Sequence, residues 1–92
     1  MSNFVVTYHY IDDVETIGQV RPAHREWLGE QFNAGKLLAS GPLVHRPAAL
    51  LIWKAESIES LNELLDQDPF EVAGLIDERT IEEWNSVFGP WS

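Results

Sequence analysis

The sequence predicts an α+β fold in which a four-stranded antiparallel sheet carries two helices on one face. β-rich and helix-periodic segments alternate in the order strand, helix, strand, strand, helix, strand. The links between them are short, and 92 residues suffice for a single domain over residues 1–92 but not for two. With right-handed crossovers, this topology is the simplest solution.

The first strand and the first helix are predicted from their residue patterns. Residues 4–10 read Phe-Val-Val-Thr-Tyr-His-Tyr, a β-branched and aromatic run that is typical of a strand. Pro22 suits the first turn of a helix, so we place the helix from about Val20 to Ala34, with an earlier start left open. Gly35 then stands where a C-cap glycine is expected.

The middle of the chain is predicted to form a strand hairpin. Residues 37–40 are a short strand, which Gly41-Pro42 is expected to break. The segment from Ala48 to Lys54 is apolar almost throughout, a pattern typical of a central strand that is covered on both faces.

The last third of the chain is predicted to supply the second helix and the fourth strand. Ser57 is a good N-cap for a helix with a leucine-rich buried stripe. Residues 75–84 are expected to contain the fourth strand, although two glutamates blur its pattern. The apolar tail, residues 87–91, is expected to pack against the rest of the chain.

Composition excludes several classes of function. Fifteen acidic residues against six basic ones give a formal net charge of −9, which repels phosphate backbones and anionic membranes, so we expect neither nucleic acid nor a membrane as partner. The absence of cysteine excludes disulfides and thiol catalysis. No secretory signal or long apolar run is visible, so a cytoplasmic location is expected.

A homodimer is expected from the size of the chain and its aromatic content. A chain this short buries a limited share of its surface, and four Trp, four Phe and two Tyr are a large apolar load. Packing one sheet against another would cover the face of the sheet that carries no helix.

The predicted topology brings candidate site residues to one rim of the sheet. The start of the first helix, the end of the second and the central hairpin share this rim, and His24 and Asp68 lie there. A carboxylate within reach of an imidazole orients the ring and stabilises its protonated form. We predict His24 and Asp68 as catalytic residues. The predicted ligand-binding residues are Tyr8, Trp27, Phe32, Ser40, Gly41, Pro42 and Phe70.

These residues also have purely structural interpretations. His24 can pack in the first helical turn, Asp68 before Pro69 can be an ordinary N-cap, and Gly41-Pro42 can be only a turn. No G-x-S-x-G elbow surrounds Ser40, which argues against a serine nucleophile. No histidine has metal-ligand spacing such as H-x-x-x-H, so neither a metal nor another cofactor is predicted.

Several short motifs, taken in order, resemble the YciI-like family. They are Arg21-Pro22-Ala23-His24, Gly35-Lys36-Leu37-Leu38, Ser40-Gly41-Pro42, Asp68-Pro69-Phe70 with Ala73-Gly74-Leu75, and Ile81-x-x-Trp84. The resemblance implies a ferredoxin-like, dimeric α+β barrel akin to muconolactone isomerase, with a His–Asp pair that falls on His24 and Asp68. One branch of that family removes chloride from a chlorinated hydroxyhydroquinone. The hairpin at residues 43–47 is shorter than in most members, which leaves a different or lost substrate preference open.

Two functions follow, and the sequence leaves open whether the protein is an enzyme. The first is a small acid–base enzyme, a lyase, isomerase or dehydrochlorinase that acts on a small aromatic or carbonyl compound. In it, His24 would be the general acid or base and Asp68 would orient the ring. The alternative is a non-catalytic, ligand-binding or accessory dimer. Haem handling, by analogy with other dimeric α+β barrels, rests on the fold alone.

Overall fold

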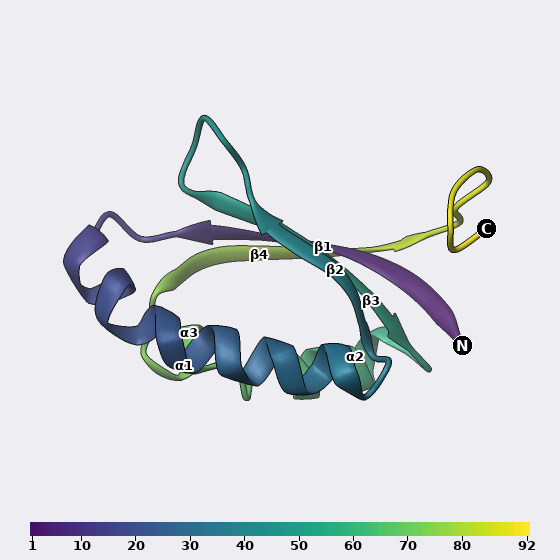
Figure 1. The fold of residues 1–92 in the computed structure, drawn as a ribbon, viewed down its shortest axis with the longest axis horizontal. Coiled ribbons are helices and arrows are strands. Elements are labelled where there is room, and N and C mark those ends of the chain that lie inside the picture. Colours follow the sequence, from purple (N-terminus) through teal and green to yellow (C-terminus); the bar gives the residue numbers. More distant parts are fainter.

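Strands and helices segregate into two layers in the computed structural model, which describes residues 1–92 (Figure 1). The strands lie in the order β2-β3-β1-β4, with every neighbouring pair antiparallel, and the helices lie on one face. This arrangement confirms the predicted ferredoxin-like α+β class. The elements are β1 (Ser2–Tyr10), α1 (Val14–Asn33), β2 (Leu37–Pro42), β3 (Ala48–Ala55), α2 (Ile58–Leu65), α3 (Pro69–Val72) and β4 (Ile76–Trp84).

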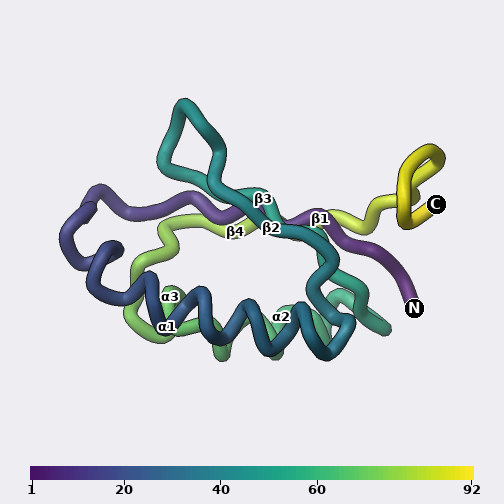
Figure 2. Tube along the Cα trace, in the orientation of Figure 1, coloured from purple at the N-terminus to yellow at the C-terminus, as the bar shows by residue number.

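The chain trace in Figure 2 shows what stands on each side of the sheet. The helices run beneath the strands, whereas the β2–β3 hairpin loop and the C-terminal segment rise on the other side. No helix covers that other side, which we call the open face. None of the helices has the length and apolar character needed to cross a bilayer.

α1 begins at Val14, well before the predicted Val20, and contains Pro22 in its interior. The side chain of Asp13 caps the helix by accepting a hydrogen bond from the Thr16 N–H at 3.1 Å. Pro22 cannot donate to the carbonyl four residues earlier, and helices bend at such positions. Figure 1 accordingly shows the first turns of α1 at an angle to the rest of the helix. The C-terminus agrees with the prediction, because Gly35 takes a φ of 78° there.

β2 continues through Gly41 and Pro42, so the predicted break at these residues is wrong. The reason is that β2 lies at the edge of the sheet, where a proline is tolerated because its missing N–H is not needed by a second neighbour. Gly41 and Pro42 pair in register with Leu50 and Ala49 of β3. The extra length carries β2 along the rim at which the site forms.

The hydrophobic core lies between the sheet and the helices. Its main cluster comprises Phe4, Val6, Tyr8, Leu28, Leu37, Ala49, Leu51, Trp53, Leu61 and Leu65. β3 is central, as predicted, but within a single chain it is covered on one face only. Leu50 points to the open face and is 39 % exposed.

The C-terminal tail packs in part. The ring of Trp91 meets that of Trp84 edge-on, with centroids 6.4 Å apart. Val87 and Phe88 are exposed, which differs from the predicted packing of the whole tail.

Candidate functional site

Asp68 lies at the junction between α2 and α3 and is fully buried. Its Oδ1 accepts a hydrogen bond from the backbone N–H of Phe70 at 2.9 Å, so it caps α3. Pro69 follows at the first helical position, where no N–H is needed. The interpretation of Asp68 as an N-cap is therefore correct, but it accounts for only one of this side chain's contacts.

The same carboxylate meets His24 of α1. Oδ1 of Asp68 lies 2.7 Å from Nδ1 of His24, although the two residues are 44 positions apart in the chain. The His24 side chain is only 9 % exposed, so the contact is shielded from water. Such a short distance is typical of a charge-assisted hydrogen bond. The structure thus brings together the two residues that the sequence predicts as a pair.

Tyr8 of β1 completes the surroundings of the carboxylate. Its hydroxyl donates to Oδ2 of Asp68 at 3.0 Å. Burial, followed by the negative charge of Asp68, raises the pKa of Tyr8 far above its ordinary value, so the phenol keeps the proton that it donates. Because Asp68 accepts from two donors already, we assign the His24–Asp68 proton to Nδ1 of the imidazole. Nε2 then carries the lone pair, and it makes no hydrogen bond within the chain.

The imidazole ring of His24 is also held by aromatic packing. It stacks flat on Phe70, with ring centroids 3.8 Å apart and an interplanar angle of 9°. Tyr10 contacts the same Phe70 ring edge-on at 5.5 Å. The stacking and the bond to Asp68 together restrict the ring to one orientation.

A cavity of about 290 Å³ opens beside the imidazole, and we call it the histidine cavity. Its volume suits a molecule with a single ring. β2 supplies Ser40, Gly41 and Pro42, all three of which the sequence predicts at the pocket. The full lining is Tyr10, Arg21, His24, Arg25, Leu28, Ser40, Gly41, Pro42, Ala49, Leu51 and Phe70.

Three of the predicted ligand-binding residues do not line the histidine cavity. Tyr8 is fully buried and reaches the site only through Asp68. Trp27 faces the core, where its ring centroid lies 5.7 Å from that of Trp53. Phe32 is 58 % exposed and lies one helical turn beyond the cavity, in a groove beside β2.

Sequence reasoning missed Arg21 and Arg25 as lining residues. Together with His24 and Leu28 they occupy one stripe of α1, at the i, i+3, i+4 and i+7 spacing that places side chains on the same helical face. That spacing around His24 is visible in the sequence and could have identified both arginines.

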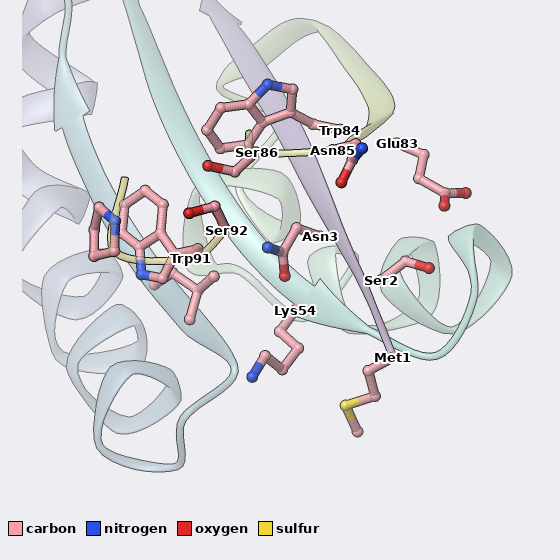
Figure 3. A pocket seen from close by; sticks show the side chains of 12 residues that line it. Met1, Ser2, Asn3, Lys54, Glu83, Trp84, Asn85, Ser86, Trp91 and Ser92 are labelled. Atoms are coloured by element: carbon pink, nitrogen blue, oxygen red, sulfur yellow. The ribbon is translucent and has the colours of Figure 1, made fainter. Parts of the chain in front are cut away.

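A larger hollow, of about 570 Å³, lies on the open face near both chain ends. Figure 3 shows Lys54, Trp84 and Trp91 around it. It contains no histidine, and none of its ionisable side chains forms an ion pair. The buried His24–Asp68 pair therefore belongs to the smaller histidine cavity. No three His, Asp or Glu side chains are close enough to share a metal ion.

Solved structures share this fold. The 5-chloro-2-hydroxyhydroquinone dehydrochlorinase TftG from Burkholderia phenoliruptrix, in complex with 2,5-dihydroxybenzoquinone, is similar with a TM-score of 0.80 and 22 % identity, over 90 % of this chain and 93 % of that chain. An antibiotic biosynthesis monooxygenase is similar with a TM-score of 0.59 and 17 % identity, over 95 % and 99 % of the two chains. A nipsnap family protein from Agrobacterium tumefaciens has a TM-score of 0.59 and 15 % identity, over 100 % and 94 %. At these identities the likeness shows the fold alone.

The sequence itself matches a known family. A comparison with curated proteins gives no match. The family model of the YCII-related domain, in contrast, matches residues 1–85, which is nearly the whole chain and includes His24, Asp68 and β2. The protein therefore belongs to the YCII-related domain family.

Proposed function

We propose that this protein is a small acid–base enzyme in which His24 moves a proton to or from an aromatic or carbonyl compound bound in the histidine cavity. One observation carries the proposal: a buried imidazole, bonded through Nδ1 to Asp68 at 2.7 Å, lines a cavity while its Nε2 has no partner in the chain. The similar fold of a dehydrochlorinase that binds a dihydroxyquinone supports the same class of chemistry.

In the proposed reaction, Nε2 of His24 acts as a general base. It takes a proton from one ring hydroxyl, and the imidazolium returns that proton to the chlorine-bearing carbon, which gives the keto tautomer. Nε2 then takes a proton from a second hydroxyl, and the electron pair left behind moves through the ring and expels chloride from that carbon, so that the net change is the loss of HCl. The imidazolium that forms is stabilised by the Asp68 carboxylate at Nδ1. In an isomerase, the same imidazolium would return the proton to another atom. Neither course requires a metal or an organic cofactor.

Tyr8 and the Phe70 N–H act as positioning groups in this proposal. Both donate to Asp68 and so hold the carboxylate in place behind the imidazole. On the substrate side, the Ser40 hydroxyl and the backbone of Gly41 and Pro42 would contact the ligand's polar atoms, and Phe70 would flank its ring.

We also propose that the protein acts as a homodimer. Val5, Leu50, Ile52 and Trp84 lie on the open face, and none of them is buried in the single chain. Packing two open faces together would remove this apolar surface from water. The cytoplasmic location stays a prediction from the sequence.

Chloride release from 5-chloro-2-hydroxyhydroquinone tests the catalytic proposal. We expect the wild-type protein to release chloride faster than buffer alone, and His24→Gln and Asp68→Asn to lose about a hundredfold or more of that rate. His45→Gln is the matched control, because His45 is exposed and does not line the cavity, and it should behave as wild type. Chloride release that is unaffected by His24→Gln would contradict the proposal.

The same experiment separates the alternative, a non-catalytic ligand-binding domain. If 2,5-dihydroxybenzoquinone binds and shifts the His24 NMR signals, yet wild-type chloride release equals the buffer rate, then a binding role is favoured over a dehydrochlorinase.

A further inference from the structure

We infer that the histidine cavity takes its ligand as an anion, a single-ring compound with an ionised oxygen that Arg21 and Arg25 hold above His24. This inference rests on the proposed function, because it concerns the substrate of the same cavity. It specifies that the substrate is negatively charged, and it assigns a binding role to two arginines that the acid–base proposal does not use.

The first support is the charge of the lining compared with that of the chain. The chain has fifteen acidic and six basic residues, yet the histidine cavity is lined by two arginines and by no aspartate or glutamate. A lining drawn at random from this chain would contain more acids than bases. The cavity is thus a local positive site on a protein that otherwise repels anions.

The second support is that neither arginine is neutralised within the chain. Arg79 shows the contrast: its guanidinium pairs with Glu71 at 2.5 Å and Asp66 at 2.8 Å. Arg21 and Arg25 form no ion pair at all. Their planar donors are therefore free to bind an oxyanion, a task for which guanidinium geometry is well suited.

The third support is that both arginines lie close enough to Tyr10, in the cavity wall, to act on its phenol. Burial and the charge of Asp68 raise the pKa of Tyr10, and Arg21 and Arg25 each act in the opposite direction. Tyr10 lines the cavity and packs on Phe70, the ring that supports His24. Both arginines therefore act on a residue of the cavity wall.

In the proposed reaction, the positive charges of Arg21 and Arg25 would stabilise the negative charge that develops on the substrate. Removal of a proton from a ring carbon or hydroxyl by Nε2 leaves a negative charge on the substrate oxygen as an enolate or phenolate. Guanidinium groups beside the ring stabilise that charge through charge-assisted hydrogen bonds. We therefore assign Arg21 and Arg25 to binding the oxygen and His24 to moving the proton.

A pair of uncharged and charged probes tests this inference. Benzoate and benzamide have nearly the same shape but differ by one negative charge, and calorimetry gives the Kd of each. We expect wild type to bind benzoate at least about tenfold more tightly than benzamide. Arg21→Gln and Arg25→Gln should each weaken benzoate binding about tenfold and leave benzamide unchanged.

Arg46→Gln is the matched control, because it removes the same charge from an exposed residue that does not line the cavity. It should leave both affinities unchanged. Equal binding of the two probes, no benzoate binding, or an equal effect of Arg46→Gln would overturn the inference. If one of these results is found while His24→Gln loses chloride release as predicted, the anion site is rejected and the acid–base proposal is kept. If benzoate binds as predicted but His24→Gln releases chloride as fast as wild type, the acid–base proposal is rejected and the anion site is kept.

Discussion

One buried carboxylate organises the site at the scale of single residues. Asp68 accepts hydrogen bonds from a tyrosine on β1, a histidine on α1 and a backbone N–H of α3. The pairing of His24 with Asp68 was predicted from helix order and antiparallel packing, but the predicted position of His24 in the first turn of its helix is wrong. Because α1 begins at Val14, His24 lies in the middle of that helix and still meets Asp68. The bond from Tyr8 could not be predicted, because strand alternation places its side chain on a face but not opposite a particular partner.

Removing the Tyr8 hydroxyl should therefore lower the free energy of unfolding more than removing the Tyr10 hydroxyl. Tyr8→Phe leaves Oδ2 of Asp68 buried without a donor, so we expect the free energy of unfolding to fall by about 1–3 kcal/mol. Tyr10→Phe is the matched control, since the Tyr10 hydroxyl makes no hydrogen bond, and it should change stability by less than about 0.5 kcal/mol. Urea unfolding followed by tryptophan fluorescence measures both. Equal losses would show that the Tyr8–Asp68 bond contributes nothing specific.

The two tyrosines also predict how stability depends on alkaline pH. Burial raises the pKa of both Tyr8 and Tyr10, so each phenol releases its proton more easily in the unfolded chain than in the folded one. Their contribution is complete below about pH 10, the ordinary tyrosine pKa, and is lost as the pH rises toward the folded-state value. Urea unfolding at several pH values should show a steeper alkaline decline in wild type than in Tyr8→Phe. Parallel declines would contradict this.

At the scale of elements, Arg79 connects β4 to both short helices beside Asp68. Its guanidinium donates to Glu71 of α3, to the side-chain oxygen of Asn62 in α2 at 2.9 Å and to Asp66 at the end of α2. Arg79 also stands next to Tyr8 in the register of β1 and β4. The α2–α3 junction is thus attached to β4 at Arg79, directly opposite Tyr8, which donates to Asp68.

Arg79→Met should loosen this junction. The side chain is largely buried and the change leaves Glu71 without its partner, so we expect a loss of about 2 kcal/mol in unfolding free energy. Amide hydrogen exchange at Phe70 and Val72 should become faster. Arg46→Met, at an exposed position, serves as control and should change neither quantity. Unaltered exchange at α3 in Arg79→Met would show that the attachment is unimportant.

The element that sequence reasoning placed least well is α1, and the reason is tertiary. Pro22 suggested a helix start, because an interior proline is unfavourable. The structure offsets that cost by the Asp13 cap and by burying Ile17 against Phe70 and Leu75 in a second small core. Such packing cannot be read from local propensity. The strands were predicted nearly in full, although glutamates blur the pattern of β4 and β2 continues beyond its predicted break.

At the scale of the whole molecule, the two faces of the sheet have different roles. The helix-covered face holds the core and the His24–Asp68 pair, whereas the open face carries exposed apolar residues such as Leu50. A surface of this kind is typical of an interface.

Leu50→Glu should therefore interfere with self-association. A charge at the centre of two packed open faces would be buried without a partner, so we expect wild type to sediment as a dimer and Leu50→Glu as a monomer. Phe32→Glu places the same charge at an exposed site on the helix side and should leave the dimer intact. Analytical ultracentrifugation at micromolar concentration measures the mass. A monomeric wild type would remove the dimer from the proposal.

NMR of the three histidine rings in wild type and in Asp68→Asn tests most directly whether the Asp68 carboxylate holds the proton on Nδ1 of His24. We predict that in wild type the ring nitrogens of His24 report a proton on Nδ1. Asp68→Asn should weaken this hydrogen bond, so that the Nδ1–H proton signal of His24 moves upfield while the ring signals of His9 and His45 do not change. A His24 ring without a proton on Nδ1, or an Nδ1–H signal that stays in place when the carboxylate is removed, would contradict the proposed pairing.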